Sequence, residues 1–232
     1  MNNMMKVKNI KKSYGDKVVL EDVSFEINKG ELVAFLGNNG VGKTTTLEII
    51  TGVQSIEYGN VEINNIGIKD IEFKKQYGLV VDNMDIFLNL KGIEYLNLIA
   101  DLYRISKEKR KEKIEALSKQ LGIYEDLKIK VKNYSKGMKQ KLMIIGELLH
   151  EPSVLILDEP FNGLDPKAIY IVKSLLRKYT NQGNAVLYST HILDTVEHFS
   201  DRILILKSGK ITYNLTMEEI EKENINLEEI FF

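Results

Sequence analysis

The chain of 232 residues contains no cysteine, which excludes disulfide bonds, thiolate catalysis and zinc sites ligated by cysteine. Histidine is also scarce: its three residues are scattered along the sequence and suggest no metal cluster. Proline occurs only three times, and the sequence has no proline-rich linker, internal repeat or low-complexity segment. We therefore expect one continuous globular protein whose chemistry does not depend on thiols.

An excess of charge and a long apolar run are missing too. The net charge is −1, from 32 basic and 33 acidic residues, so there is no general attraction to nucleic acid or anionic lipid. No apolar run reaches membrane-spanning length, and the first six residues contain no apolar segment of a signal peptide. We expect a protein that is soluble when isolated and that stays in the cytosol or docks there onto another component.

A chain of 232 residues can bury one large core, or one core with a small appended lobe. Hydrophobic residues make up 44% and charged residues 28%, which is ordinary for a globular protein. We predict a single α/β domain over residues 1–232. Approximately, residues 1–82 and 151–232 form its core with an N-terminal β subdomain, and residues 83–150 form an inserted helical subdomain.

The periodicity of apolar residues gives the expected elements. Strands are predicted around 7–9 and at 18–27, 32–36, 154–157 and 185–189, with further short strands within 56–81 and a hairpin of 203–206 with 210–213. Helices are predicted at 92–103, 107–121, 135–149, 166–179 and 194–199, with one docked helix in the tail after residue 217.

A glycine-rich motif follows the expected strand at residues 32–36. It fits the pattern G-x-x-x-x-G-K-S/T without a mismatch. Glycines let the backbone turn its N–H groups toward an anion, Lys43 adds a positive charge, and the Thr44 hydroxyl can ligate Mg²⁺. A glycine-rich turn with an unrelated lysine is the alternative, and the flanking strand and helix disfavour it. The expected phosphate-binding residues are Gly37, Asn38, Asn39, Gly40, Val41, Gly42, Lys43, Thr44 and Thr45.

Two carboxylates follow a second apolar strand, at Asp158 and Glu159. The carboxyl end of a buried strand is where open α/β sheets bind ligands. Asp158 is placed to hold Mg²⁺, and Glu159 to polarise an attacking water as the catalytic base. The alternative is that the pair caps the N-terminus of a helix. Without the glycine-rich motif the two interpretations would be about equally favoured; with it, the metal and base roles are favoured.

His191 follows the predicted strand 185–189 and reaches the same rim of the sheet. A single histidine is more often structural, but this position favours a contact to a terminal phosphate or to the attacking water, so we expect it to take part in catalysis. His150 and His198 have no such placement, and we interpret them as structural.

Further segments carry a resemblance to a known family. They are Tyr134–Gln140 (a variant of L-S-G-G-Q), Phe161–Asp165, Ser189–His191 and Leu227–Phe231, together with Tyr14. With the two motifs above, in this order, they resemble the ATP-binding subunit of an ABC transporter over nearly the whole chain.

The resemblance implies a P-loop NTPase fold: a RecA-like, mostly parallel sheet with flanking helices, an antiparallel β subdomain and an inserted α-helical subdomain. It implies ATP and Mg²⁺ as cofactors, with Tyr14 stacked on adenine. Ser135 and Gly137 would contact ATP bound to a second subunit, in a head-to-tail dimer that we expect to be a homodimer. A separate integral-membrane permease is the other implied partner, which places the chain on the cytoplasmic side of the cell membrane as a peripheral subunit.

Two positions depart from the family pattern. Asn38 replaces a usual proline, a change that a turn tolerates. Asp82 stands where the family has a glutamine that ligates the metal, and we expect Asp82 to take that role. Aspartate here, with the Tyr-Ser-x-Gly-Met signature, resembles export-type subunits of bacteriocin and drug resistance systems. We therefore expect export of a drug, a peptide or a lipid-like compound.

Two other classes of protein remain as alternatives. One is an ABC ATPase that acts on nucleic acid or the ribosome. The basic stretch 104–113 contains interleaved glutamates, so a solvated helix face is the favoured interpretation and no nucleic-acid partner is expected. The other is a GTPase or a small-molecule kinase. The segment 28–31 has only a superficial similarity to a guanine-recognition motif, and we interpret it as a β-turn.

Overall fold

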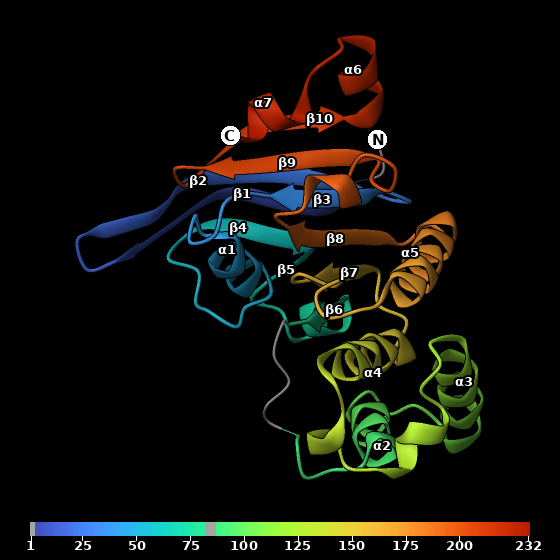
Figure 1. Cartoon of the computed structure of the whole chain (residues 1–232). Helices are drawn as coiled ribbons and strands as arrows, with labels where there is room; N and C mark the ends of the chain where they lie inside the picture. Colours follow the sequence, from blue (N-terminus) through green and yellow to red (C-terminus); the bar gives the residue numbers. More distant parts are fainter. Residues whose placement is uncertain (1–2, 82–86) are drawn as a thin grey trace.

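A computed structural model describes residues 3–81 and 87–232, and it shows a mixed β-sheet with helices packed around it (Figure 1). The strands are β1 (Asn3–Tyr14), β2 (Lys17–Asn28), β3 (Leu32–Leu36), β4 (Tyr58–Ile63), β5 (Ile66–Gly67), β6 (Tyr77–Val80), β7 (Val154–Leu157), β8 (Ala185–Thr190), β9 (Arg202–Lys207) and β10 (Lys210–Thr216). In the described residues they form one sheet in the order β5-β4-β1-β2-β10-β9-β3-β8-β7-β6.

The centre of the sheet is parallel. Strands β9, β3, β8, β7 and β6 run side by side in the same direction, and every residue of β3, β7 and β8 is buried. Successive side chains of a strand point to opposite faces, and both faces of these strands are covered. This is why their sequences are continuous apolar runs.

The other half of the sheet is mostly antiparallel, except that β10 also pairs with β2 in parallel at Lys210 and Asp22. β1 pairs with β2 and with β4, β4 pairs with β5, and β10 pairs with β9 across the turn at Ser208 and Gly209. Both turn residues have positive φ, 47° and 74°, as the tight hairpin turn requires. The predicted α/β fold, with a parallel part and an antiparallel part, is confirmed.

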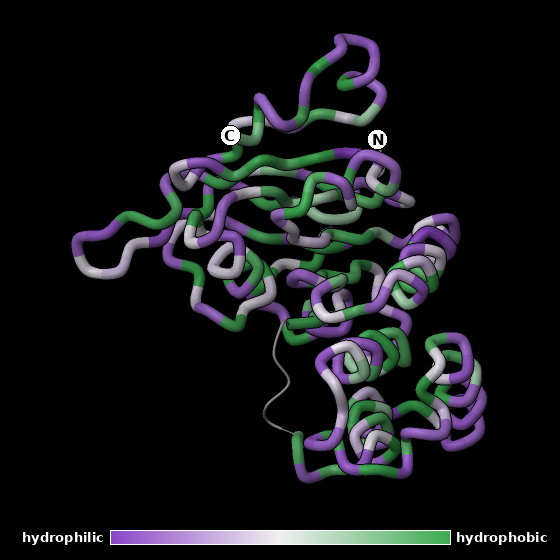
Figure 2. Tube along the Cα trace, viewed as in Figure 1, coloured by the Kyte–Doolittle hydropathy of each residue, from purple (hydrophilic) through white to green (hydrophobic). Residues whose placement is uncertain are grey.

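The helices are α1 (Lys43–Ile50), α2 (Gly92–Leu102), α3 (Lys107–Gln120), α4 (Lys136–Leu149), α5 (Pro166–Asn181), α6 (Met217–Lys222) and α7 (Leu227–Phe231). Figure 1 shows α2, α3 and α4 gathered beyond the β6 edge of the sheet. Apolar residues of α2–α5 pack with one face of the central strands, and those of α1 pack with the other face. Figure 2 shows the hydrophobic residues concentrated in the central strands, while α3 is largely hydrophilic.

Within residues 3–81 and 87–232, short 3-10 helices occupy four connections: Ile71–Lys75, Glu125–Lys128, Val131–Asn133 and Leu193–Thr195. The first lies in the region 56–81, where the sequence predicted only strands. The last lies where an α-helix was predicted at 194–199, and that prediction is wrong. So short a segment cannot offset the cost of α-helix nucleation, and Val196 and Phe199, three residues apart, turn into the core.

The C-terminal tail forms two short helices, α6 and α7, instead of the single predicted helix. Asn224 breaks the path with a φ of 51°, and Asn226 caps α7 by accepting the N–H groups of Glu228 and Glu229. The tail is docked as predicted, because Ile220, Leu227 and Phe231 belong to the main core. None of the helices in the described part of the chain is both long and apolar enough to cross a bilayer.

Candidate functional site

The glycine-rich loop lies between the buried strand β3 and helix α1, as predicted. Gly42 is the residue before the helix and has a φ of 110°, and an added Cβ would lie 2.9 Å from the Leu20 side chain. A Cβ on Gly37 would meet the Leu206 carbonyl oxygen at 2.9 Å. These two positions therefore accept only glycine, and the loop can curl closely around the start of α1.

The Lys43 side chain is buried beneath this loop. Its Nζ donates to the Gly37 carbonyl at 2.6 Å and to the Asn38 carbonyl at 3.3 Å. Burial lowers the pKa of Lys43, while the carboxylates of Glu159 and Asp158 oppose that shift. The lysine faces a cavity of about 340 Å³ lined by Val19, Asn39, Gly40, Gly42, Lys43, Thr44, Thr45, Asp158 and Glu159.

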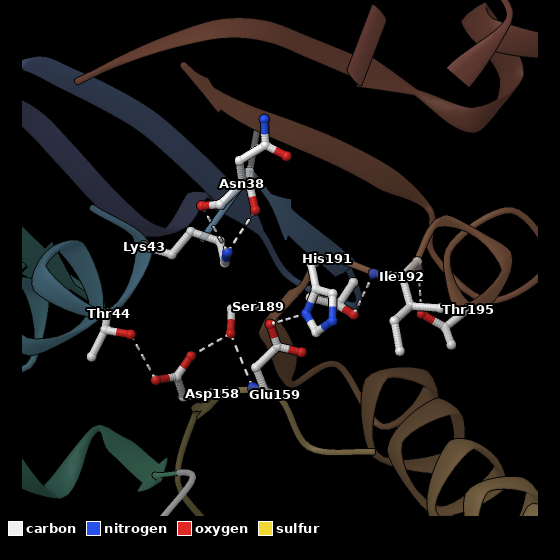
Figure 3. Close-up of polar contacts among 11 residues, drawn as sticks. Asn38, Lys43, Thr44, Asp158, Glu159, Ser189, His191, Ile192 and Thr195 are labelled. Atoms are coloured by element: carbon white, nitrogen blue, oxygen red, sulfur yellow. Dashed lines mark hydrogen bonds and ion pairs between the residues drawn. The ribbon is translucent and has the colours of Figure 1, made fainter. Parts of the chain in front are cut away.

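Asp158 stands at the end of β7 and faces the start of α1. Thr44 Oγ1 donates to its Oδ2 at 3.1 Å, and Ser189 Oγ donates to its Oδ1 at 2.5 Å (Figure 3). A hydroxyl and a carboxylate are the hard oxygen ligands that Mg²⁺ prefers, and Mg²⁺ is commonly held by one or two carboxylates with substrate phosphates. No cluster of three or more acidic or histidine ligands occurs among the described residues. The donor set fits Mg²⁺ bound together with a phosphate.

Glu159 and His191 meet at the same rim of the sheet. The Glu159 Oε1 lies 2.8 Å from His191 Nδ1, and Figure 3 shows the two side chains pointing toward each other. Glu159 has a φ of 48°, which is uncommon for a residue with a side chain, and its N–H donates to Ser189 Oγ at 3.0 Å. The sequence patterns predicted no role for Ser189. Its position two residues before His191, at the end of a strand, is the signal that was available.

The family model for ABC transporters matches residues 20–162. The uncharacterized ABC transporter ATP-binding protein YhcH of Bacillus subtilis is 37% identical over 100% of this chain and 75% of its own length. This chain belongs to the ABC transporter family.

Two further relatives agree with that assignment. The lantibiotic transport ATP-binding protein SrtF of Streptococcus pyogenes is 33% identical over 98% of this chain and 96% of its own. A solved structure of the ATP-binding subunit of an ABC transporter is 33% identical, has a TM-score of 0.91 and covers 98% of this chain and 97% of that one. The chain is the ATP-binding subunit of an ABC transporter, and its activity is ATP hydrolysis. The predicted family and fold class are confirmed.

The signature segment of this ABC subunit, Tyr134–Gln140, contains the N-cap and the first residues of helix α4. Ser135 is exposed and its Oγ accepts the N–H of Met138 at 3.2 Å, whereas Gly137 is buried. A Cβ on Gly137 would lie 2.5 Å from the carbonyl oxygen of Gly163, in the loop that follows Glu159. Ser135 and Gly137 are not among the described residues that line the cavity beside Lys43. Within one protomer, Gly137 thus has a packing role against that loop.

Of the two remaining predicted site residues, the structure describes only Tyr14. Tyr14 lies near the tip of the β1–β2 hairpin and is half exposed; its hydroxyl donates to Gln54 Oε1 at 2.7 Å, and Lys12 Nζ lies 5.3 Å from its ring centre. Tyr14 is not among the described lining residues. Asp82 lies outside the residues that the structure describes, so its role as a metal ligand stays a prediction.

Proposed function

We propose that this ABC subunit hydrolyses MgATP at a dimer interface and drives a separate membrane permease that exports a drug, a peptide or a lipid-like compound. The observation that carries the hydrolysis site is the connected set of polar contacts from Thr44 through Asp158 and Ser189 to Glu159 and His191, beside Lys43. Phosphoryl transfer depends mainly on positioning and on neutralising charge, and these residues offer both.

Each residue of the site has a proposed part. The backbone N–H groups of residues 39–45 and the Lys43 ammonium bind the phosphates. Thr44 and Asp158 would hold Mg²⁺, which when bound neutralises charge developing on the phosphate oxygens; the predicted third ligand is Asp82. Because Thr44 already faces Asp158, these two oxygens would need little rearrangement to share one ion.

Glu159 is the proposed general base. Its carboxylate can accept a proton from a water attacking the terminal phosphate. His191 restrains the direction of that carboxylate through the contact at 2.8 Å. With the proton on Nδ1, the other ring nitrogen of His191 is left to contact the attacking water.

The Glu159→Gln variant tests this function. The amide is nearly isosteric but is not a base, so we expect steady-state ATP hydrolysis to be abolished while ATP binding persists and traps a dimer. Hydrolysis is measured by phosphate release and the dimer by size-exclusion chromatography with ATP. Lys43→Ala is the control that should lose ATP binding as well. Near wild-type hydrolysis in Glu159→Gln would remove Glu159 from its role.

The second subunit and the helical lobe belong to the same proposal. Ser135 and Gly137 lie at the start of α4, in the helical segment proposed to form a subdomain over residues 83–150. We propose that they complete the ATP site of a second, identical subunit placed head to tail, with Tyr14 stacked on the adenine. The support is the family membership, together with the exposure of Ser135 away from its own cavity.

Export and the permease rest on the relatives. SrtF is named for lantibiotic transport, and another relative is a subunit of a transporter. We propose that the chain binds peripherally to its permease at the cytoplasmic side of the membrane. A neighbouring gene that encodes a protein with several transmembrane helices would support the proposal. Deletion of that gene should make the cells more sensitive to the exported compound.

Ion pairs in the basic stretch 104–113 count against the nucleic-acid alternative. In the basic stretch, Lys109 and Lys113 pair with Glu151, and Arg110 pairs with Asp101. These cations are partly neutralised by their own chain. Salt-sensitive binding of DNA or RNA to the purified protein would favour that alternative over transport.

A further inference from the structure

Ser189 is a fully buried serine at the end of strand β8, between the two carboxylate residues of the site. Leu157 pairs with Tyr188 in the parallel sheet, which brings Asp158 and Ser189 next to each other. Figure 3 shows the Ser189 hydroxyl between Asp158 and Glu159. A single hydroxyl therefore contacts both Asp158, the proposed metal ligand, and Glu159, the proposed base.

The two contacts of this hydroxyl have different directions. A serine hydroxyl has one hydrogen to donate and can accept others. Because the Glu159 N–H can only donate, Ser189 accepts from it at 3.0 Å, and its own hydrogen goes to Asp158 Oδ1 at 2.5 Å. The Asp158 carboxylate is thereby held by one oxygen, and its Oδ2 is directed toward Thr44.

The bond to the Glu159 N–H acts on the backbone. Glu159 has a φ of 48°, a left-handed conformation that a residue with a Cβ adopts only when its surroundings hold it. Its side chain then reaches His191. Without the acceptor at Ser189, the Glu159 peptide would be free to relax, and its carboxylate would turn away from this position.

We propose that Ser189 is a positioning residue for the hydrolysis reaction, which sets the metal-facing oxygen of Asp158 and the direction of the base Glu159 at the same time. This inference rests on the roles proposed above for Asp158 and Glu159. Ser189 is not itself one of the residues that line the cavity, and in the proposed mechanism it does not contact the nucleotide.

The test compares Ser189→Ala with Ser189→Thr, which keeps the hydroxyl on a strand that tolerates β-branching. Ser200→Ala is the matched control: Ser200 is also buried, and its hydroxyl bonds to the Tyr188 hydroxyl at 2.7 Å. Tyr188 precedes Ser189 on β8, so its side chain points to the opposite face of the sheet, away from Asp158.

We expect Ser189→Ala to lower kcat about 10- to 100-fold, as is usual when the outer partner of a metal ligand is removed, with little change in KM for ATP. A second measurement does not depend on turnover: the affinity of the protein–ADP complex for Mn²⁺, followed by electron paramagnetic resonance, should fall by about tenfold. Ser189→Thr should regain most of both values, and Ser200→Ala should keep both.

The inference is wrong if Ser189→Ala matches Ser200→Ala in kcat and in Mn²⁺ affinity. Should Ser189→Ala fail to fold, Ser189→Cys, whose thiol is a weak donor, must show both losses for the inference to stand. Failure of the wider proposal is separate: active Glu159→Gln would exclude Glu159 as the base, while the Mn²⁺ affinity of the Ser189 variants would still report on Asp158.

Discussion

Glu147 on helix α4 has an unusual environment for a carboxylate. It lies against strand β6, where its Oε2 accepts the N–H of Leu79 at 3.2 Å, and its Cβ packs close to Gly78. Burial raises the pKa of Glu147 from 4.5 to about 7, although the bond from Leu79 opposes the shift. This side chain joins the helical segment to the strand that precedes Asp82, and it is only partly ionised near neutral pH.

Glu147→Gln should stabilise the protein at pH 8. The amide still accepts the Leu79 N–H but buries no charge. In the wild type the burial penalty is complete above pH 7, and it is relieved as the pH falls toward 4.5, because the folded state takes up the proton before the unfolded state does. We expect the variant to be more stable by about 1–3 kcal/mol at pH 8 and the difference to shrink at pH 5, measured by urea unfolding.

His150 serves as an internal reference for that experiment. Its ring stacks on Tyr103 with centroids 3.7 Å apart, and burial lowers the pKa of His150 to about 4. Below pH 6.5 the unfolded state binds this proton first, so acidification destabilises the wild type and the variant alike. A stability difference between the two proteins that stayed constant from pH 5 to pH 8 would contradict the burial of a titrating Glu147.

At the scale of elements, the start of α4 resembles the start of α3. Both helices have a serine N-cap: Ser135 accepts the N–H of Met138 at 3.2 Å, and Ser106 accepts the N–H of Lys109 at 3.3 Å. Both helices have 14 residues and both caps are exposed. The two serines therefore satisfy similar backbone donors, but only Ser135 lies in the signature segment.

Ser135→Ala and Ser106→Ala should separate capping from function. Each variant loses one cap, so each should lose about 1 kcal/mol of unfolding free energy. Only Ser135→Ala should also lower ATP hydrolysis, since Ser135 is proposed to contact the nucleotide of the partner subunit. Thermal unfolding and phosphate release measure the two effects. If both variants hydrolyse ATP equally fast at a temperature where both are folded, Ser135 acts only as a helix cap.

At the scale of the whole molecule, one protomer supplies one side of the proposed ATP site. The cavity beside Lys43 is lined by the phosphate loop, Val19 and the end of β7, while the signature segment lies at the start of α4 in the helical part. The packing of α4 against β6 and of Gly137 against Gly163 fixes the helical part to the sheet within one chain. A head-to-tail dimer would place the start of α4 from each protomer over the cavity of the other.

Mixing two variants with impaired hydrolysis tests this arrangement. Lys43→Ala removes the phosphate contact of one side of a site, and Ser135→Ala removes the contact of the other side. A heterodimer of the two carries both changes in one site and leaves the second site intact. We expect the mixture, after subunits have exchanged, to hydrolyse ATP faster than the sum of the separate variants. If the mixture only equals that sum, the site does not take Lys43 and Ser135 from different subunits.

Local patterns predicted much of the fold, and they predicted the phosphate loop of the site. The apolar runs at 154–157 and 185–189 are buried central strands, and Lys43 and Thr44 begin a helix after the glycine loop, because these patterns follow from chain periodicity and backbone geometry. The prediction for 194–199 was wrong because a segment of this length has no strong periodicity of its own. There the anchoring of Val196 and Phe199 in the core selected a tighter turn.

The order of residues alone was enough to indicate a phosphate loop, an acidic pair after a strand and a histidine after another, since each motif is local. The contact of Ser189 with Asp158 and Glu159 joins residues about 30 positions apart. It exists because β7 and β8 are parallel neighbours in one register, and a shift of one residue would turn the hydroxyl to the opposite face. Strand register is set by packing across the sheet, so only the folded chain reveals which side chains share a hydrogen bond.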